Sequence, residues 1–304
     1  MPALNRVVTA GESTRQSEDP AMSTFDTPEP ISVSVELGVG NLRVTASERR
    51  DTVVEVRPSD PGKKSDLAAA EQTLVELAGG TLVVRAPGRW TARYAPWGSR
   101  ESVDVEIALP AGSQLRVDSV MSAVRCAGRL GECHIKTGAG EILVDVAGPL
   151  ELRTGAGAIT VNRAMGQVEV RTGTGEVRVG AIDGHAVVKN SCGDTWIGEV
   201  AGGLQVNASF GKISVDRAEA EVAAKTAYGD VRLGDVARGA IVAQTGFGKV
   251  EVGIRTGVPA WLDLQAQYGN VHNELESTGP PRPGEGTVEV RSRSSFGDVT
   301  VHRS

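Results

Sequence analysis

The chain has 304 residues, of which 40% are hydrophobic and only 4% aromatic, and its formal net charge is −6. This length allows one large or two ordinary domains, and the negative charge removes the electrostatic case for general nucleic-acid binding. No apolar run approaches the roughly 18 residues of a membrane span, and residues 1–19 lack the apolar segment of a signal peptide. We therefore expect a cytoplasmic protein with no membrane span.

Residues 1–30 are rich in Ser, Thr, Glu and Pro and predict a disordered tail. The segment 31–118 alternates like strands but has no fixed period. We expect it to form a β-rich region that caps the following domain, because an uncovered sheet end exposes unpaired backbone. Residues 65–77 predict one or two helical turns before a strand. The strand candidates are 31–37, 41–45, 52–57, 81–85 and 102–109.

A loop in this region carries two tryptophans, a tyrosine and an arginine in close succession. These residue types fit a local binding patch for a protein partner, a sugar or a phosphate. They also fit a loop that folds over the side of the following domain, which is the simpler interpretation. The residues are Trp90, Arg93, Tyr94 and Trp97.

From residue 119 to residue 304 one short phrase recurs, in which a small polar residue precedes a glycine by three positions and apolar residues alternate on both sides. Successive glycines are 17 to 28 residues apart, most often 18. That period is too short for paired helices and fits a coil of two short strands and two turns. We predict an all-β fold, a parallel β-solenoid (a β-helix or β-roll) of nine or ten coils. The glycines are Gly140, Gly157, Gly175, Gly193, Gly211, Gly229, Gly248, Gly269 and Gly297.

Strand parity points two positions of the phrase into the solenoid. The first, here called the threonine slot, holds the small polar residue and predicts a hydrogen-bonded ladder. The second, the ladder slot, lies just before the glycine and holds five of the seven Phe and Tyr residues. We predict a buried, stacked aromatic ladder there, with an exposed platform for sugars or bases as the alternative. Its residues are Phe210, Tyr228, Phe247, Tyr268 and Phe296.

The three cysteines, Cys126, Cys133 and Cys192, are too few and too widely spaced for a disulfide scaffold or a zinc site. All three fall on inward parity. We therefore expect small core residues with reduced thiols.

An outward position, just before the threonine slot, aligns basic residues along one face of the coils. The position after each glycine gives a mixed, mostly acidic row. Such rows favour solubility and discourage sideways sheet association. The alternative is a docking stripe for an anionic polymer or an acidic partner. The basic stripe consists of Lys136, Arg153, Arg171, Lys189 and Lys225.

No catalytic constellation, cofactor motif or metal-ligand spacing occurs, so we assign no catalytic, cofactor-binding or metal residues. The histidines His134, His185, His272 and His302 share no ligand spacing. The glycine phrases belong to a repeat and not to a phosphate-binding strand–helix junction. The Gly-Asp pairs lack the nonapeptide calcium pattern.

The repeat, together with the segments Glu36–Val44 and Val103–Pro110, resembles the DUF4097 β-strand-repeat family, also labelled "putative adhesin", and looks like an actinobacterial member. The resemblance covers about residues 31–302. It implies a β-solenoid or β-roll and brings no established catalytic residues. Some relatives are associated with envelope stress, and the resemblance suggests such a role for this chain by analogy only.

These observations favour a non-enzymatic cytoplasmic scaffold or protein-interaction module with an unknown protein partner. The alternative is an adhesin-like or carbohydrate-binding module, and an enzyme acting on polysaccharide is the least favoured. The final strand candidate, Val299–Val301, has no capping element after it. It predicts an open solenoid end through which two copies could associate.

Overall fold

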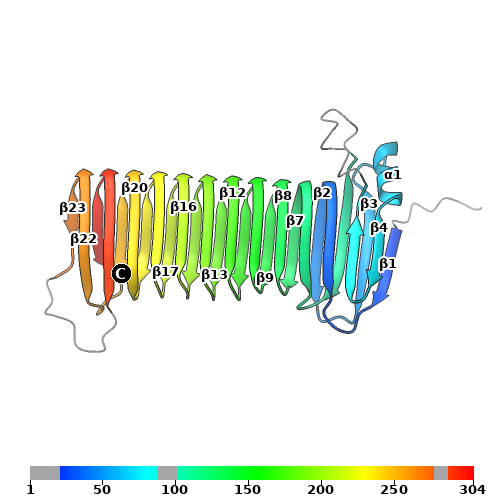
Figure 1. Ribbon diagram of the computed structural model, residues 1–304, viewed down its shortest axis with the longest axis horizontal. Coiled ribbons are helices and arrows are strands. Elements are labelled where there is room, and N and C mark those ends of the chain that lie inside the picture. Colours follow the sequence, from blue (N-terminus) through cyan, green and yellow to red (C-terminus); the bar gives the residue numbers. More distant parts are fainter. Residues whose placement is uncertain (1–20, 88–100, 277–286) are drawn as a thin grey trace, which may run out of the picture.

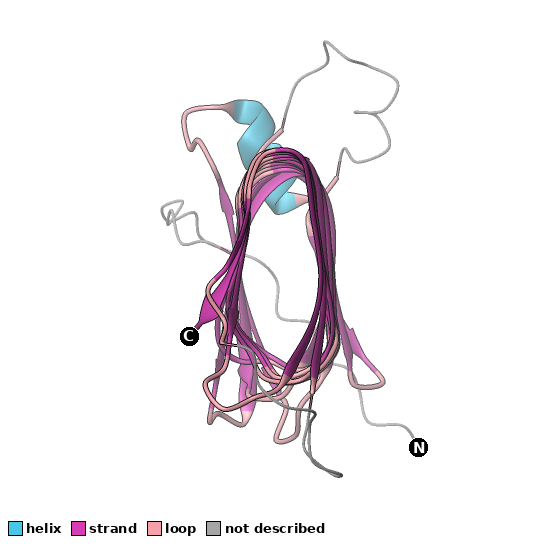
Figure 2. Ribbon diagram, turned by 90° about the vertical axis from the view of Figure 1, so that its left-hand side faces the viewer, coloured by secondary structure: helices cyan, strands magenta, loops and turns pink. Residues whose placement is uncertain are grey.

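The computed structural model describes residues 21–87, 101–276 and 287–304. They form a long rod of parallel strands with a flattened oval cross-section (Figures 1 and 2). The predicted β-solenoid is therefore confirmed. Among the residues described, no helix combines the length and the apolar character needed to cross a membrane.

Each central coil contributes one strand to each broad face of the oval, and each strand pairs in parallel with its equivalents one coil before and one coil after. One face holds β8 (Cys133–Ala139), β10 (Leu150–Ala156), β12 (Val168–Thr174), β14 (Ala186–Cys192), β16 (Leu204–Phe210), β18 (Val222–Tyr228), β20 (Gly239–Phe247), β22 (Ala260–Tyr268) and β24 (Val288–Phe296). The other face holds β9 (Ile142–Ala147), β11 (Ile159–Ala164), β13 (Val177–Ile182), β15 (Thr195–Val200), β17 (Ile213–Ala218), β19 (Val231–Val236), β21 (Val250–Ile254), β23 (Val271–Asn273) and β25 (Val299–Arg303).

The parallel stack extends beyond the repeat into the N-terminal region. The long strands β2 (Ser32–Ser47) and β7 (Gln114–Arg129) each run round a whole coil and pair along their length. The strands β5 (Thr81–Arg85) and β6 (Val103–Pro110) add another coil beyond β2. The repeat with β7 gives ten coils, where nine or ten were predicted, and β2 and β5–β6 raise the number among the described residues to twelve.

Antiparallel strands and a helix close the N-terminal end. Strand β4 (Leu74–Ala78) pairs with β5, β3 (Asp51–Pro58) pairs with β6, and β1 (Ala21–Asp26) pairs with β3, all antiparallel. The helix α1 (Lys64–Glu71) packs on β3 and β6. Strand β1 lies within residues 1–30, so the disordered tail predicted there is wrong for residues 21–26, and residues 1–20 lie outside the described residues.

The core follows strict alternation along each strand. In β10, for example, Leu150 and Leu152 are buried while Glu151 and Arg153 reach the surface. Because every coil repeats this pattern in register, the interior is a continuous column of Val, Ile, Leu and Ala side chains.

The chain leaves sequence order at its C-terminal end. Strand β24 pairs with both β20 and β22, and β25 pairs with both β21 and β23. The last coil in the sequence is therefore inserted between its two predecessors (Figure 1). The prediction that Val299–Val301 forms the open edge is wrong. The described end coil is β22–β23.

Candidate functional site

The five aromatic residues of the ladder slot form one continuous stack along the rod. Ring centroids are 4.6–5.0 Å apart, and neighbouring rings are 3–11° from parallel. Phe296 lies between Phe247 and Tyr268 because of the inserted coil. The predicted ladder is confirmed as a stack, in the spatial order Phe210, Tyr228, Phe247, Phe296, Tyr268.

The ladder is exposed, and the prediction that it is buried is wrong. The five side chains have exposed fractions of 45–63%. The polar residues of the threonine slot are buried, as predicted, and most of their side chains donate to backbone carbonyls near the glycine: Thr154 Oγ1, for example, donates to the carbonyl of Ala156, and Thr226 Oγ1 to that of Tyr228. The inward alternation of the strand ends at the threonine slot, because the residue two positions later is exposed whether the slot holds threonine, as before Tyr228, or alanine, as before Phe210.

The same geometry corrects the prediction for one cysteine. Cys126 and Cys133 are buried core residues, as predicted, and burial raises the pKa of the Cys133 thiol to about 12. Cys192 occupies the ladder slot beside Phe210 and is exposed. It therefore lies at one end of the aromatic stack.

The exposed surface of the ladder consists mainly of ring edges. Each of the three inner rings, Tyr228, Phe247 and Phe296, has a stacked neighbour on both faces. Among the described residues, only the outer faces of Phe210 and Tyr268 have no stacked ring. The ladder is thus an apolar ridge that spans four strand spacings from Phe210 to Tyr268, or roughly 19 Å.

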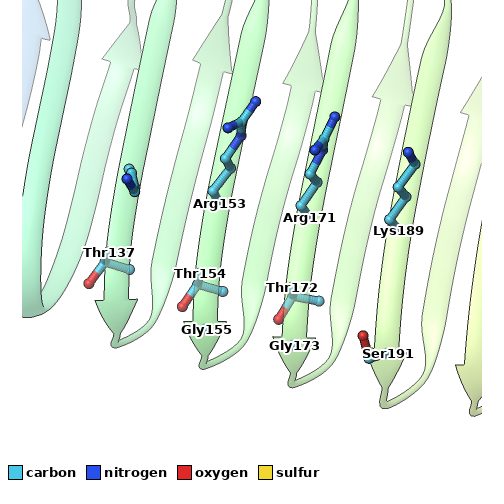
Figure 3. Close-up of a pocket in the computed structure, with 10 residues that line it drawn as sticks. Thr137, Arg153, Thr154, Gly155, Arg171, Thr172, Gly173, Lys189 and Ser191 are labelled. Atoms are coloured by element: carbon cyan, nitrogen blue, oxygen red, sulfur yellow. The ribbon is translucent and has the colours of Figure 1, made fainter.

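A shallow groove runs along the same strands, and its floor is formed by the position just before the ladder slot. The residue between the threonine and ladder slots points outward and is small in eight of nine coils, for example Gly155, Gly173 and Ser191. Longer side chains of the preceding outward row line one side. Figure 3 shows Arg153, Arg171 and Lys189 side by side over this floor.

The first half of the groove is cationic. It has a volume of about 400 Å³ and is lined by Lys136, Arg153, Arg171 and Lys189, which are neighbours in the strand register. Carboxylates two residues earlier reduce its charge. Arg153 pairs with Glu151, and Arg171 pairs with Glu169 at 2.5 Å. The predicted basic stripe is therefore contiguous over four coils and partly neutralised.

The second half of the groove lies beside the ladder. It has a volume of about 490 Å³, and its charged or amide side chains include Lys225, Gln244, Gln265 and Arg293. Asn207 separates Lys225 from the four cations of the first half. We call the groove and the ladder together the docking strip, since one edge of the coils carries both.

The Gly-Asp pairs of the repeat have a structural role. The aspartate after a corner glycine accepts a hydrogen bond from a backbone N–H of the adjacent coil, as from Lys212 to Asp194 at 2.8 Å and from Lys249 to Asp230 at 2.7 Å. These contacts explain why aspartate follows the glycine in several coils. The candidate patch Trp90, Arg93, Tyr94 and Trp97 lies outside the described residues.

An ion cluster of Arg255, Glu219 and Asp235 lies away from the docking strip. Arg255 donates hydrogen bonds to Glu219 at 2.7 Å and to Asp235 at 2.7 Å. The hydrogen bond from Arg255 lowers the pKa of Glu219. Burial raises the pKa of Asp235, but hydrogen bonds from Arg255 and Ser304 outweigh it, so the net shift is downward.

This cluster predicts acid sensitivity. A carboxylate with a lowered folded-state pKa contributes stability above its unfolded pKa, and the contribution is lost as pH falls through the folded value. We expect the free energy of unfolding to fall between about pH 5 and pH 3, and to fall less in Arg255→Met. Urea unfolding at pH 7, 5, 4 and 3 measures both. Equal pH dependence in the two proteins would contradict the assignment.

The geometry defines a class of protein: a parallel β-solenoid that displays a stacked aromatic ridge and a polar groove on one edge. Among the described residues, no group of three or more His, Cys, Asp or Glu side chains is placed to hold a metal ion. The chain belongs to the Toastrack DUF4097 family, whose model matches residues 31–302. No curated protein matches the chain in sequence.

Several solved structures are similar over nearly their whole length. A "putative adhesin" from Bacteroides fragilis is 12% identical, covers 94% of this chain and 98% of its own, and gives a TM-score of 0.39. A "putative lipid binding protein" from Parabacteroides distasonis is 11% identical, with coverages of 94% and 97% and a TM-score of 0.31. Sequence identities and TM-scores this low do not support a conclusion about function.

Proposed function

We propose that the chain is a non-enzymatic interaction module that binds a protein partner along the docking strip. The observation that supports this function is the ladder: five aromatic side chains, each about half exposed, stacked on one edge of a rigid rod. Aromatic residues and arginine are enriched in protein–protein interfaces. A rigid frame also reduces the conformational entropy that a partner's binding must overcome.

The ring orientation favours a protein over a carbohydrate as the ligand of the ladder. A sugar or base that stacks on an aromatic platform needs an open ring face. The inner rings Tyr228, Phe247 and Phe296 cover one another's faces and present edges. Ring edges and the neighbouring polar groove suit the side chains of a partner protein, so the adhesin-like or carbohydrate-binding module remains the alternative.

We also propose that the protein works in the cytoplasm. The exposed thiol of Cys192 supports this compartment, since reducing conditions preserve free thiols. Fractionation of the native host, with detection of the untagged chain, tests it: we expect the chain in the cytosolic fraction, and its recovery outside the cell would contradict the proposal. The link with envelope stress stays a prediction from the resemblance.

The ladder can be tested without disturbing the fold. In earlier coils the ladder slot holds Ala139, Ala156 and Thr174, so small residues are compatible with the corner. We expect the triple variant Tyr228→Thr, Phe247→Thr, Phe296→Thr to bind its partner at least tenfold more weakly than the native chain. Affinity capture from native-host lysate, quantified by mass spectrometry, measures the loss.

Two comparison variants make the result specific. Trp196→Ser removes an exposed aromatic residue from β15, on the other face, and we expect capture to stay unchanged. Replacing Arg153, Arg171 and Lys189 with Glu tests the cationic half of the groove separately. If the ladder variant captures the same proteins as the native chain, the proposal is wrong, and glycan binding that disappears in the ladder variant would establish the carbohydrate alternative instead.

A further inference from the structure

The two ends of the rod differ in how they are closed. At the N-terminal end, antiparallel strands β4 and β3 cover the coil β5–β6, and the inward residues of that coil are fully buried: Leu82 and Val84 are 0% exposed, and Ile107 is 1% exposed. Among the described residues, the outer edge of β22 at the opposite end pairs with no strand.

The interior is incompletely covered at the β22–β23 end. Leu262 and Leu264 point inward but are only partly buried, and Val271 is 45% exposed. Their equivalents in the adjacent coil, Val290, Ser292 and Val299, are 0% exposed. Trp261 is also 57% exposed on this edge strand. The end of the rod therefore combines unpaired backbone groups with uncovered apolar side chains, a surface suited to strand addition.

We propose that a second copy of this chain covers this end, with β22 of each copy paired antiparallel across a two-fold axis. Rotation about an axis normal to the sheet keeps the inward face inward, so the two hydrophobic interiors join into one. The end coil has β22 on one face of the oval and β23 on the other. Because a second copy has the same cross-section, it offers a partner strand to each of them. The fold already adds antiparallel strands to its parallel stack, at β4 and β3.

The sequence of β22 is self-complementary in this arrangement. With Leu264 on the axis, Leu262 lies opposite Ala266 of the second copy, and both belong to the inward row. On the outward row, Asp263 lies opposite Gln265, and Trp261 opposite Gln267. No like charges face each other across the pairing, and like charges directly opposite would destabilise it.

The difference between the ends also sets the size of the assembly. A rod with two open ends would add copies without limit, whereas pairing of the same end on two copies makes a closed dimer. Because the N-terminal end is covered by β1, β3, β4 and α1, we infer a dimer and not a filament.

The mass of the full chain in solution tests this assembly. We expect light scattering coupled to size exclusion to give twice the 31.7 kDa of one chain at micromolar concentration. Leu264→Lys places two charges on the axis, and we expect at least a tenfold rise in the dimer dissociation constant. Gln265→Lys adds the same charge one residue away, opposite Asp263 of the second copy, and should leave the dimer intact.

Circular dichroism and thermal unfolding of Leu264→Lys show whether the variant remains folded. A second variant, Trp261→Glu, changes a residue of the exposed outward row of β22. We expect it to weaken the dimer independently of the change at Leu264. A monomeric native chain would overturn the proposal. So would a dimer that persists in both weakening variants, or one that is lost in the triple ladder variant, since either result places the contact elsewhere.

Discussion

Replacing Gly211 with alanine is expected to destabilise the rod by about 3–5 kcal/mol, which is large for one substitution. Gly211 has φ of +137° at the corner, and a Cβ there would lie 2.1 Å from the carbonyl oxygen of Gly193 in the adjacent coil. The contact is with backbone, so relief requires the coils to move apart. Urea unfolding followed by circular dichroism measures the loss.

Gly79→Ala provides the matched control. Gly79 also has a positive φ, +57°, but no atom lies within 4 Å of the added Cβ. The cost should be about 1 kcal/mol, the ordinary penalty for a residue with a side chain in this conformation. If both substitutions cost the same, backbone conformation and not the close stacking of coils explains the corner glycines.

Asn190→Ala should cost about 2–4 kcal/mol, because it removes a buried donor that bonds to two backbone carbonyls. Asn190 is 2% exposed, and its Nδ2 donates to the carbonyls of Gly175 at 3.1 Å and Gly193 at 2.9 Å. Both acceptors belong to corner glycines, so the loss affects two coils at once. The measurement is again urea unfolding.

Asn190→Thr tests whether the hydrogen bond or the side-chain volume matters. Threonine is the usual residue of this slot, and Thr245 Oγ1 donates to the carbonyl of Gly229 at 2.8 Å in the same way. We expect Asn190→Thr to retain most of the stability that Asn190→Ala loses. Equal losses in the two variants would contradict a role for the buried donor.

The repeat made the architecture predictable from the sequence. The spacing of the corner glycines and the alternation around them give the coil, the parallel register and the stacking of Phe210 on Tyr228. These features depend on local geometry that every coil repeats. The residue pattern therefore specifies the same coil geometry in every repeat.

The orientation of the ladder could not be read from strand parity. Parity holds as far as Thr226, but the chain then turns at Gly229, whose φ is +139°, and Tyr228 just before this turn is exposed. Ala227 and Tyr228 are both exposed, so the exposed docking strip lies where the alternation of the strand ends. Small residues before the ladder slot, such as Gly246 and Ser295, were the available signal for the groove.

The spatial order of the last coils could not be predicted from the sequence either. Strands β22 and β24 carry the same kind of phrase, so the sequence alone does not say which one follows β20. Strand β25 has five residues and β23 has three. The longer strand gains hydrogen bonds on both sides when it lies inside the stack, which accounts for the inserted coil.

The most direct test of the docking strip uses Cys192 as an anchor beside the ladder. Cys126 and Cys133 are buried, so a photo-crosslinker that reacts with thiols labels Cys192 selectively in the folded chain. In native-host lysate we predict crosslinks from Cys192 to one partner protein, and their loss in the labelled triple ladder variant. Equal crosslinking by the native chain and the ladder variant, or none by either, would contradict the account.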